Sequence, residues 1–140
     1  MSAEPPRFVL DSFALLAFLQ GEAGMARIKA LLIAAEQDEC WVYLSWINLG
    51  EVLYITERGQ GVRRAQEVLA RVQTLPVQLL EATSQAVLDA AHIKATHKLS
   101  FADAFAVTAA LHENAIILTG DPEFESVEQI VRVEWLEEDH

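Results

Sequence analysis

Asp103 is an acidic residue inside an otherwise apolar stretch. Residues 101–111 contain only one other polar side chain, that of Thr108. A helix that is apolar on all sides is normally buried. A buried carboxylate without a partner is strongly destabilising or becomes neutral, so Asp103 requires a compensating cation.

Three further acids are attached to apolar runs that predict core elements. They are Asp11 after residues 8–10, Glu51 within residues 46–53, and Asp121 after residues 116–120. Four such carboxylates predict one shared divalent metal site. Mg²⁺ and Mn²⁺ favour carboxylate oxygens, whereas the four histidines form no zinc-binding pattern.

A divalent ion held by carboxylates can generate hydroxide and neutralise charge on phosphoryl oxygens, which predicts phosphodiester chemistry. Ser12 and Thr119 adjoin two of the acids, and their hydroxyls can hydrogen-bond a carboxylate or a bound water. Ser12 can equally be the N-cap of the helix that follows it. Asn48 lies one helical turn before Glu51 and shares its face.

Each acid also has an interpretation without function. Asp11 could be a polar strand end, Glu51 could lie on a solvated face, and Asp121 before Pro122 could start a turn. Taken singly, these interpretations suffice for Asp11 and Asp121. The joint pattern with Asp103 favours the metal site.

Short apolar runs alternate with helical patterns along the whole chain. Strands are predicted at residues 7–11, 41–44, 77–80, 115–119 and, at an edge, 131–134; helices are predicted at 12–20, 25–36, 46–57, 62–73, 83–96 and, after the N-cap Ser100, up to 113. This alternation predicts an α/β fold with a parallel sheet of four to five strands between helices. Functional sites in such sheets lie beyond the carboxyl ends of the strands, where Asp11 and Asp121 fall.

The composition predicts a single domain over residues 1–140. No run is long enough to span a membrane, and one cysteine, Cys40, together with the lack of a secretory signal, favours the cytoplasm. The net charge of −11 argues against binding nucleic acid through a broad basic patch. The densest basic stretch, Arg58 to Arg71, is either a solvated helix face or a phosphate contact.

Four segments, in this order, resemble the PIN-domain family and specifically its small VapC-type toxins. They are Val9-Leu10-Asp11-Ser12, Asn48-Leu49-Gly50-Glu51-Val52, Leu99-Ser100-Phe101-Ala102-Asp103-Ala104 and Leu118-Thr119-Gly120-Asp121-Pro122-Glu123-Phe124. The resemblance implies a PIN-like three-layer α/β/α fold. It also implies a Mg²⁺- or Mn²⁺-dependent endoribonuclease that hydrolyses RNA and is the toxin of a type II toxin–antitoxin pair.

The resemblance assigns the acidic cluster to Asp11, Glu51, Asp103 and Asp121. Thr119 matches a hydroxyl position associated with that cluster, and Glu125 is a loosely matched further acid. Gly120 stands where many relatives carry a larger polar residue. A cognate antitoxin is the implied inhibitor. A homodimer is expected, with apolar surface along residues 41–54 and the helix beginning at Val62.

Other families with acids after strands fit less well. A haloacid-dehalogenase-like phosphatase needs a second Asp two positions after the first, where this chain has Phe13. A receiver domain needs an acceptor Asp after the third strand, where Glu81-Ala82-Thr83 follows instead, and a flap-type nuclease would be longer and more basic. The remaining alternative is a catalytically silent PIN-like scaffold that binds RNA or a partner protein.

Overall fold

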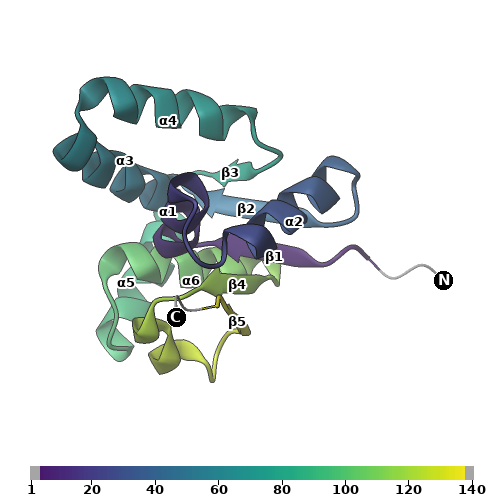
Figure 1. Ribbon diagram of the computed structural model, residues 1–140. Coiled ribbons are helices and arrows are strands. Elements are labelled where there is room, and N and C mark those ends of the chain that lie inside the picture. Colours follow the sequence, from purple (N-terminus) through teal and green to yellow (C-terminus); the bar gives the residue numbers. More distant parts are fainter. Residues whose placement is uncertain (1–3, 138–140) are drawn as a thin grey trace.

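Five parallel strands form the centre of the computed structural model, which describes residues 4–137 (Figure 1). The strands are β1 (Arg7–Leu10), β2 (Trp41–Ser45), β3 (Gln78–Leu80), β4 (Ile116–Thr119) and β5 (Val133–Trp135). Their spatial order is β3-β2-β1-β4-β5, so β1 is central and β5 is an edge strand paired with β4. The predicted parallel sheet is confirmed.

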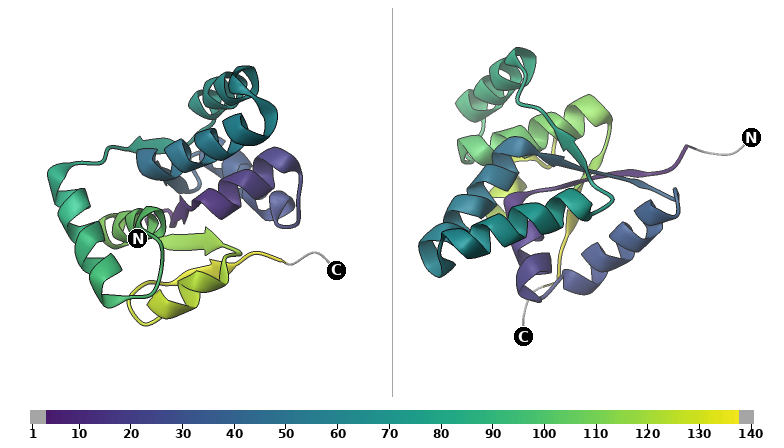
Figure 2. Two further views of the ribbon diagram at one scale, coloured as in Figure 1. Left: turned by 90° about the vertical axis from the view of Figure 1, so that its left-hand side faces the viewer. Right: turned by 90° about the horizontal axis from the view of Figure 1, so that it is seen from above.

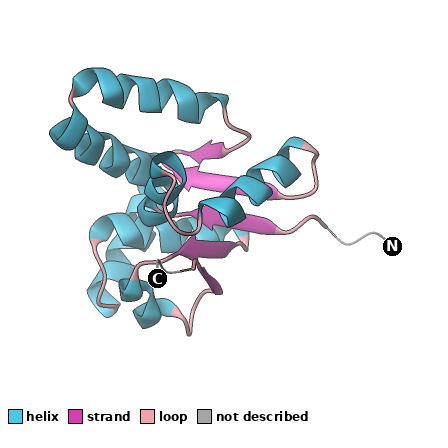
Figure 3. Cartoon of the chain, viewed as in Figure 1, coloured by secondary structure: helices cyan, strands magenta, loops and turns pink. Residues whose placement is uncertain are grey.

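Helices connect successive strands, except before β5, where a 3₁₀ helix does so (Figure 3). They are α1 (Ser12–Gln20), α2 (Met25–Glu36), α3 (Trp46–Gln60), α4 (Val62–Thr74), α5 (Ser84–Thr96), α6 (Phe101–Glu113) and the 3₁₀ helix η1 (Pro122–Val127). Within residues 4–137, none of these helices has the length and apolar character that a membrane span requires.

Two apolar cores cover the two faces of the sheet, which gives the three-layer arrangement (Figure 2). Leu10, Leu44 and Leu118 point into the core formed with α1 to α4. Val9 and its neighbours on the adjacent strands point into the other core, with α5, α6 and η1. Since successive residues of a strand point to opposite faces, strands covered on both sides must be apolar throughout.

Most boundaries differ from the prediction by one or two residues, and the differences at β1 and α3 have clear causes. Asp11 is not part of β1 but is the N-cap of α1, so the capping role expected for Ser12 was wrong. The two residues are both good N-caps, and the backbone turns into the helix one residue earlier. Helix α3 continues through Gly59 to Gln60, because one exposed helical glycine costs only about 1 kcal/mol.

Candidate functional site

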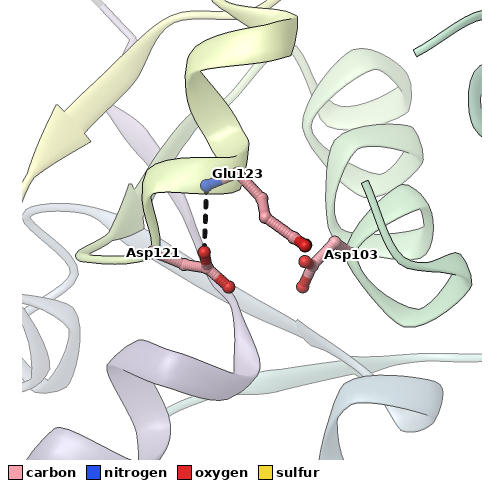
Figure 4. A group of neighbouring side chains, drawn as sticks. All are labelled: Asp103, Asp121 and Glu123. Atoms are coloured by element: carbon pink, nitrogen blue, oxygen red, sulfur yellow. Dashed lines mark hydrogen bonds between the residues drawn. The ribbon is translucent and has the colours of Figure 1, made fainter. Parts of the chain in front are cut away.

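The site lies where β1 and β4 end side by side. Leu10 pairs with Leu118 in the sheet, so the residues that follow these strands begin close together. Asp11 follows β1, and Asp121 follows β4 after Thr119 and Gly120. The first turn of α6 brings Asp103 to the same place (Figure 4).

Asp11 is fixed in position by hydrogen bonds from two elements. Its side chain is 1% exposed. Oδ1 accepts the backbone N–H of Ala14 at 2.7 Å, and Oδ2 accepts the hydroxyl of Thr119 at 2.5 Å. The hydroxyl oxygen of Thr119 in turn accepts the backbone N–H of Asp121 at 3.0 Å. Thr119 therefore connects the two acids that follow neighbouring strands.

Asp103, Asp121 and Glu123 form a group of carboxylates suited to one cation. One oxygen from each of them lies within 4.8 Å of the others. Asp103 is buried, Asp121 is half-buried and Glu123, on η1, is exposed. The backbone N–H of Glu123 donates to Oδ1 of Asp121 at 2.9 Å and orients that carboxylate.

Burial disfavours negative charge on two of the acids. Burial raises the pKa of Asp11 to about 7, with a smaller contribution from the charge of Asp121, although the Thr119 and Ala14 hydrogen bonds oppose it. Burial, a hydrogen bond with Glu123 and the charges of Asp11 and Asp121 raise the pKa of Asp103 to about 8. Desolvation is the largest cause for both acids, as expected for a carboxylate buried in an apolar helix.

Asn48 and Ser12 connect the helices around the acids. Asn48 is fully buried. Its Nδ2 donates to Oγ of Ser12 at 3.2 Å and to the carbonyl of Ala102 at 3.0 Å. The hydroxyl of Ser12 donates to the carbonyl of Asn48 at 3.3 Å. Asn48 therefore ties α3 to α1 and to the turn of α6 that carries Asp103.

Three of the predicted acids, Asp11, Glu51 and Glu125, lie outside the group of three carboxylates identified within residues 4–137. Glu51 is half-buried on α3, one turn after Asn48, and α3 packs against α1 and α6. Glu125 is exposed on η1. Their participation stays a prediction.

Glu123 is the site residue that the sequence interpretation missed. It was quoted within a motif but given no role. The sequence did contain a signal for Glu123. Asp121 before Pro122 predicts a helical turn that begins at Asp121, and such a turn places Glu123 close to Asp121.

The donor chemistry of the group fits a hard cation. All the grouped side chains offer carboxylate oxygens, which suits Mg²⁺ or Mn²⁺ better than zinc. Asp103 within the group and Asp11 beside it have raised pKa values, which a bound cation would lower.

This geometry defines a class of protein: a three-layer α/β fold with an acidic site at the carboxyl end of a parallel sheet. Residues 8–130 match the PIN domain, so the chain belongs to the PIN-domain family, as its motifs predicted. A comparison with curated proteins by sequence gives no match.

Solved structures of VapC toxins have the same fold. The structure of VapBC2 from Rickettsia felis bound to a promoter DNA fragment is similar with a TM-score of 0.74 and 13% identity, covering 94% of this chain and 99% of that one. DNA-bound VapBC from Salmonella typhimurium is similar with a TM-score of 0.73 and 18% identity, covering 92% of this chain and 97% of that one. Mycobacterium tuberculosis VapC20, described as a sarcin-ricin loop cleaving toxin, is similar with a TM-score of 0.65 and 21% identity, covering 86% of this chain and 94% of that one.

Proposed function

We propose that the protein is a Mg²⁺- or Mn²⁺-dependent endoribonuclease and the toxin of a toxin–antitoxin pair. The observation that carries this proposal is the approach of Asp103, Asp121 and Glu123 to within 4.8 Å, next to the buried Asp11. The PIN-domain fold and the similarity to VapC structures support it.

Asp103 and Asp121 would hold the metal, with Asp11 beside them and Glu51 completing the acidic set. Glu123 joins them in this proposal because its carboxylate belongs to the same group. When bound, the ion would activate water for attack on phosphorus and offset charge on the phosphoryl oxygens. Thr119, Asn48 and Ser12 would position the acids through the hydrogen bonds described above.

The substrate proposed for this site is RNA. An acidic pocket repels phosphate until a cation neutralises it, so binding of substrate should require the metal. Because the chain has a net charge of −11, recognition should depend on the shape of the RNA near the pocket more than on bulk attraction.

The proposed regulator is a short antitoxin segment with a basic side chain that reaches the carboxylates. An arginine there could pair with a carboxylate through two hydrogen bonds and exclude the metal. Complexes such as the toxin–antitoxin complex from Klebsiella pneumoniae, similar to this chain with a TM-score of 0.62, support a protein partner. With such a substrate and partner, the proposed site of action is the cytoplasm.

The decisive experiment is cleavage of total cellular RNA by the purified protein. Activity should vanish with EDTA and return with Mg²⁺ or Mn²⁺ but not with Zn²⁺. Asp103→Asn is the matched inactive variant. If the metal-loaded wild type cleaves no RNA and its expression does not arrest growth, a catalytically silent scaffold becomes a better interpretation than a ribonuclease.

A separate experiment tests the partner. Expression of the chain alone should arrest growth, and co-expression of the adjacent small gene should restore it. Rescue without a physical complex of the two products would argue against inhibition by an inserted segment.

A further inference from the structure

The aromatic ring of Phe13 lies against Gly120 at the edge of the acidic site. A Cβ atom added to Gly120 would lie 2.4 Å from Cε1 and 2.7 Å from Cζ of Phe13. Gly120 sits between Thr119, which holds Asp11, and Asp121, which belongs to the carboxylate group. The ring therefore occupies the space that a side chain at position 120 would need.

Phe13 does not contribute its ring to the protein core. It is 42% exposed, whereas its neighbours Ser12 and Ala14 are buried. An edge of the ring contacts the backbone at Gly120. The exposed part of the ring lies beside Gly120, which directly precedes the proposed metal-binding acid Asp121. An aromatic face at this position can be covered by a planar ligand that enters the acidic site.

Electrostatics offers little help in holding an RNA on this chain. The chain has a net charge of −11, and three of its arginines are paired with carboxylates: Arg7 with Glu113, Arg27 with Glu134 and Arg64 with Glu67. Stacking of an unpaired base on an aromatic ring is independent of net charge. It contributes about 5- to 150-fold in affinity per base.

We infer that Phe13 is a stacking platform for an unpaired nucleobase that flanks the cleaved phosphate. The inference rests on the proposed ribonuclease function and adds a determinant of substrate choice to it. An RNA is favoured over a protein as the occupant because the ring adjoins the carboxylates that would hold the metal ion, and that ion would bind the scissile phosphate. Gly120 is needed because any larger residue would displace the ring.

The test combines changes in the protein with changes in the RNA. After the cleavage site of the wild type is mapped, kcat and KM are measured on oligonucleotides with an abasic nucleotide at each flanking position in turn. At one of these positions, the abasic substitution should raise the KM of the wild type about 5- to 150-fold. The same substitution should change the KM of Phe13→Ala little, because the two changes remove the same interaction. The kcat should change little.

Matched variants separate stacking from packing. Phe13→Leu keeps an apolar side chain against Gly120 but lacks a π face, so it should resemble Phe13→Ala; Phe13→Trp should retain the low KM. Trp41→Ala, which removes a ring of 48% exposure at the opposite end of the sheet, should leave KM unchanged. Gly120→Ala alone should raise KM. Adding it to Phe13→Ala should not raise KM further. Thermal melting verifies that each variant is folded.

The possible failures are distinguishable. A wild type that cleaves no RNA overturns the proposed function and this inference with it. An active wild type whose Phe13→Ala variant cleaves every oligonucleotide with unchanged KM overturns the inference alone. A variant that cleaves normally but resists the inhibitory partner would instead make the ring a protein contact.

Discussion

At the scale of single residues, Asp11 shows how a structural contact and a site residue can be the same group. Its carboxylate caps α1 and accepts the hydroxyl of Thr119, which fixes both oxygens. Burial nevertheless raises its pKa to about 7, so the fold holds the group in place while disfavouring its charge. A bound cation would reverse that preference and stabilise the folded protein.

The first prediction concerns the pH dependence of stability without metal. The pKa values of about 7 for Asp11 and about 8 for Asp103 exceed the unfolded value of about 4. The folded protein therefore binds more protons than the unfolded chain between about pH 4 and pH 8, and its stability should fall as pH rises through this window. Urea denaturation in EDTA should show a fall on the order of 1 kcal/mol per pH unit.

Two controls accompany that measurement. Asp103→Asn should flatten the part of the profile closest to pH 8, and added Mg²⁺ should restore stability to the wild type at pH 8. A wild-type stability that increases from pH 5 to pH 8 in EDTA would contradict the raised pKa values.

The second prediction separates the two buried acids. Asp103→Asn should abolish cleavage and weaken Mg²⁺ binding, while leaving the metal-free melting temperature at pH 8 unchanged or higher, because it removes a disfavoured charge. Asp11→Ala should also be inactive, but at pH 5, where the folded protein holds Asp11 neutral, it should lose about 1 kcal/mol of stability through the missing helix cap. Calorimetry and Mg²⁺ titration measure both effects. A large loss of melting temperature in Asp103→Asn would make that residue structural.

At the scale of elements, Asn48 determines how three helices meet at the site. It is buried in α3 and donates to Ser12 of α1 and to the Ala102 carbonyl of α6. The segments it joins are 36 and 54 residues away in the sequence. In the proposed function, such a residue would position Asp103 without taking part in the chemistry.

The third prediction is that Asn48→Ala destabilises the protein by about 1–3 kcal/mol, because the partly buried Ala102 carbonyl and the buried Ser12 hydroxyl lose their donor. Cleavage should fall as well, since α6 is no longer tied to α3. The exposed Glu57 of α3 provides the control, as Glu57→Ala should change stability by less than about 0.5 kcal/mol. Urea denaturation curves of the two variants give the comparison. Equal stability of both variants would remove Asn48 from this role.

Sequence periodicity predicted the elements well because it reports local burial. The bounds of α1 and α2 were predicted to the residue, with Gly21 at φ 66° ending α1. The assignment of the cap to Ser12 was wrong because the choice between two adjacent caps depends on where β1 stops. The nearness of Glu123 to Asp103 was missed because it depends on how η1 packs, which no local pattern records.

At the scale of the whole molecule, the acidic surface limits how RNA can be held. The fourth prediction is a shallow salt dependence: at constant Mg²⁺, log KM should change with log[KCl] by a slope of about 1 to 2, because few phosphates are neutralised by side chains. The exposed Arg63 decides between the two interpretations of the basic stretch on α3 and α4. Arg63→Ala should lower the slope by about 0.7 if this residue contacts a phosphate and leave it unchanged if it is only solvated. A steep slope in the wild type would reveal a basic binding surface.

Apolar side chains on the hairpin of α3 and α4 lead to a prediction about assembly. Tyr54, Ile55 and Val62 are 49%, 40% and 58% exposed, although these two helices pack closely on each other. A second copy of the chain would bury them in a symmetric interface, so light scattering at micromolar concentration should give the mass of a dimer. Val62→Glu should produce monomers, since an unpaired charge within an apolar interface is strongly unfavourable. Leu88→Glu on α5, where Leu88 is 65% exposed, should leave the dimer intact. A monomeric wild type would refute the dimer, and dissociation by Leu88→Glu alone would move the interface to α5.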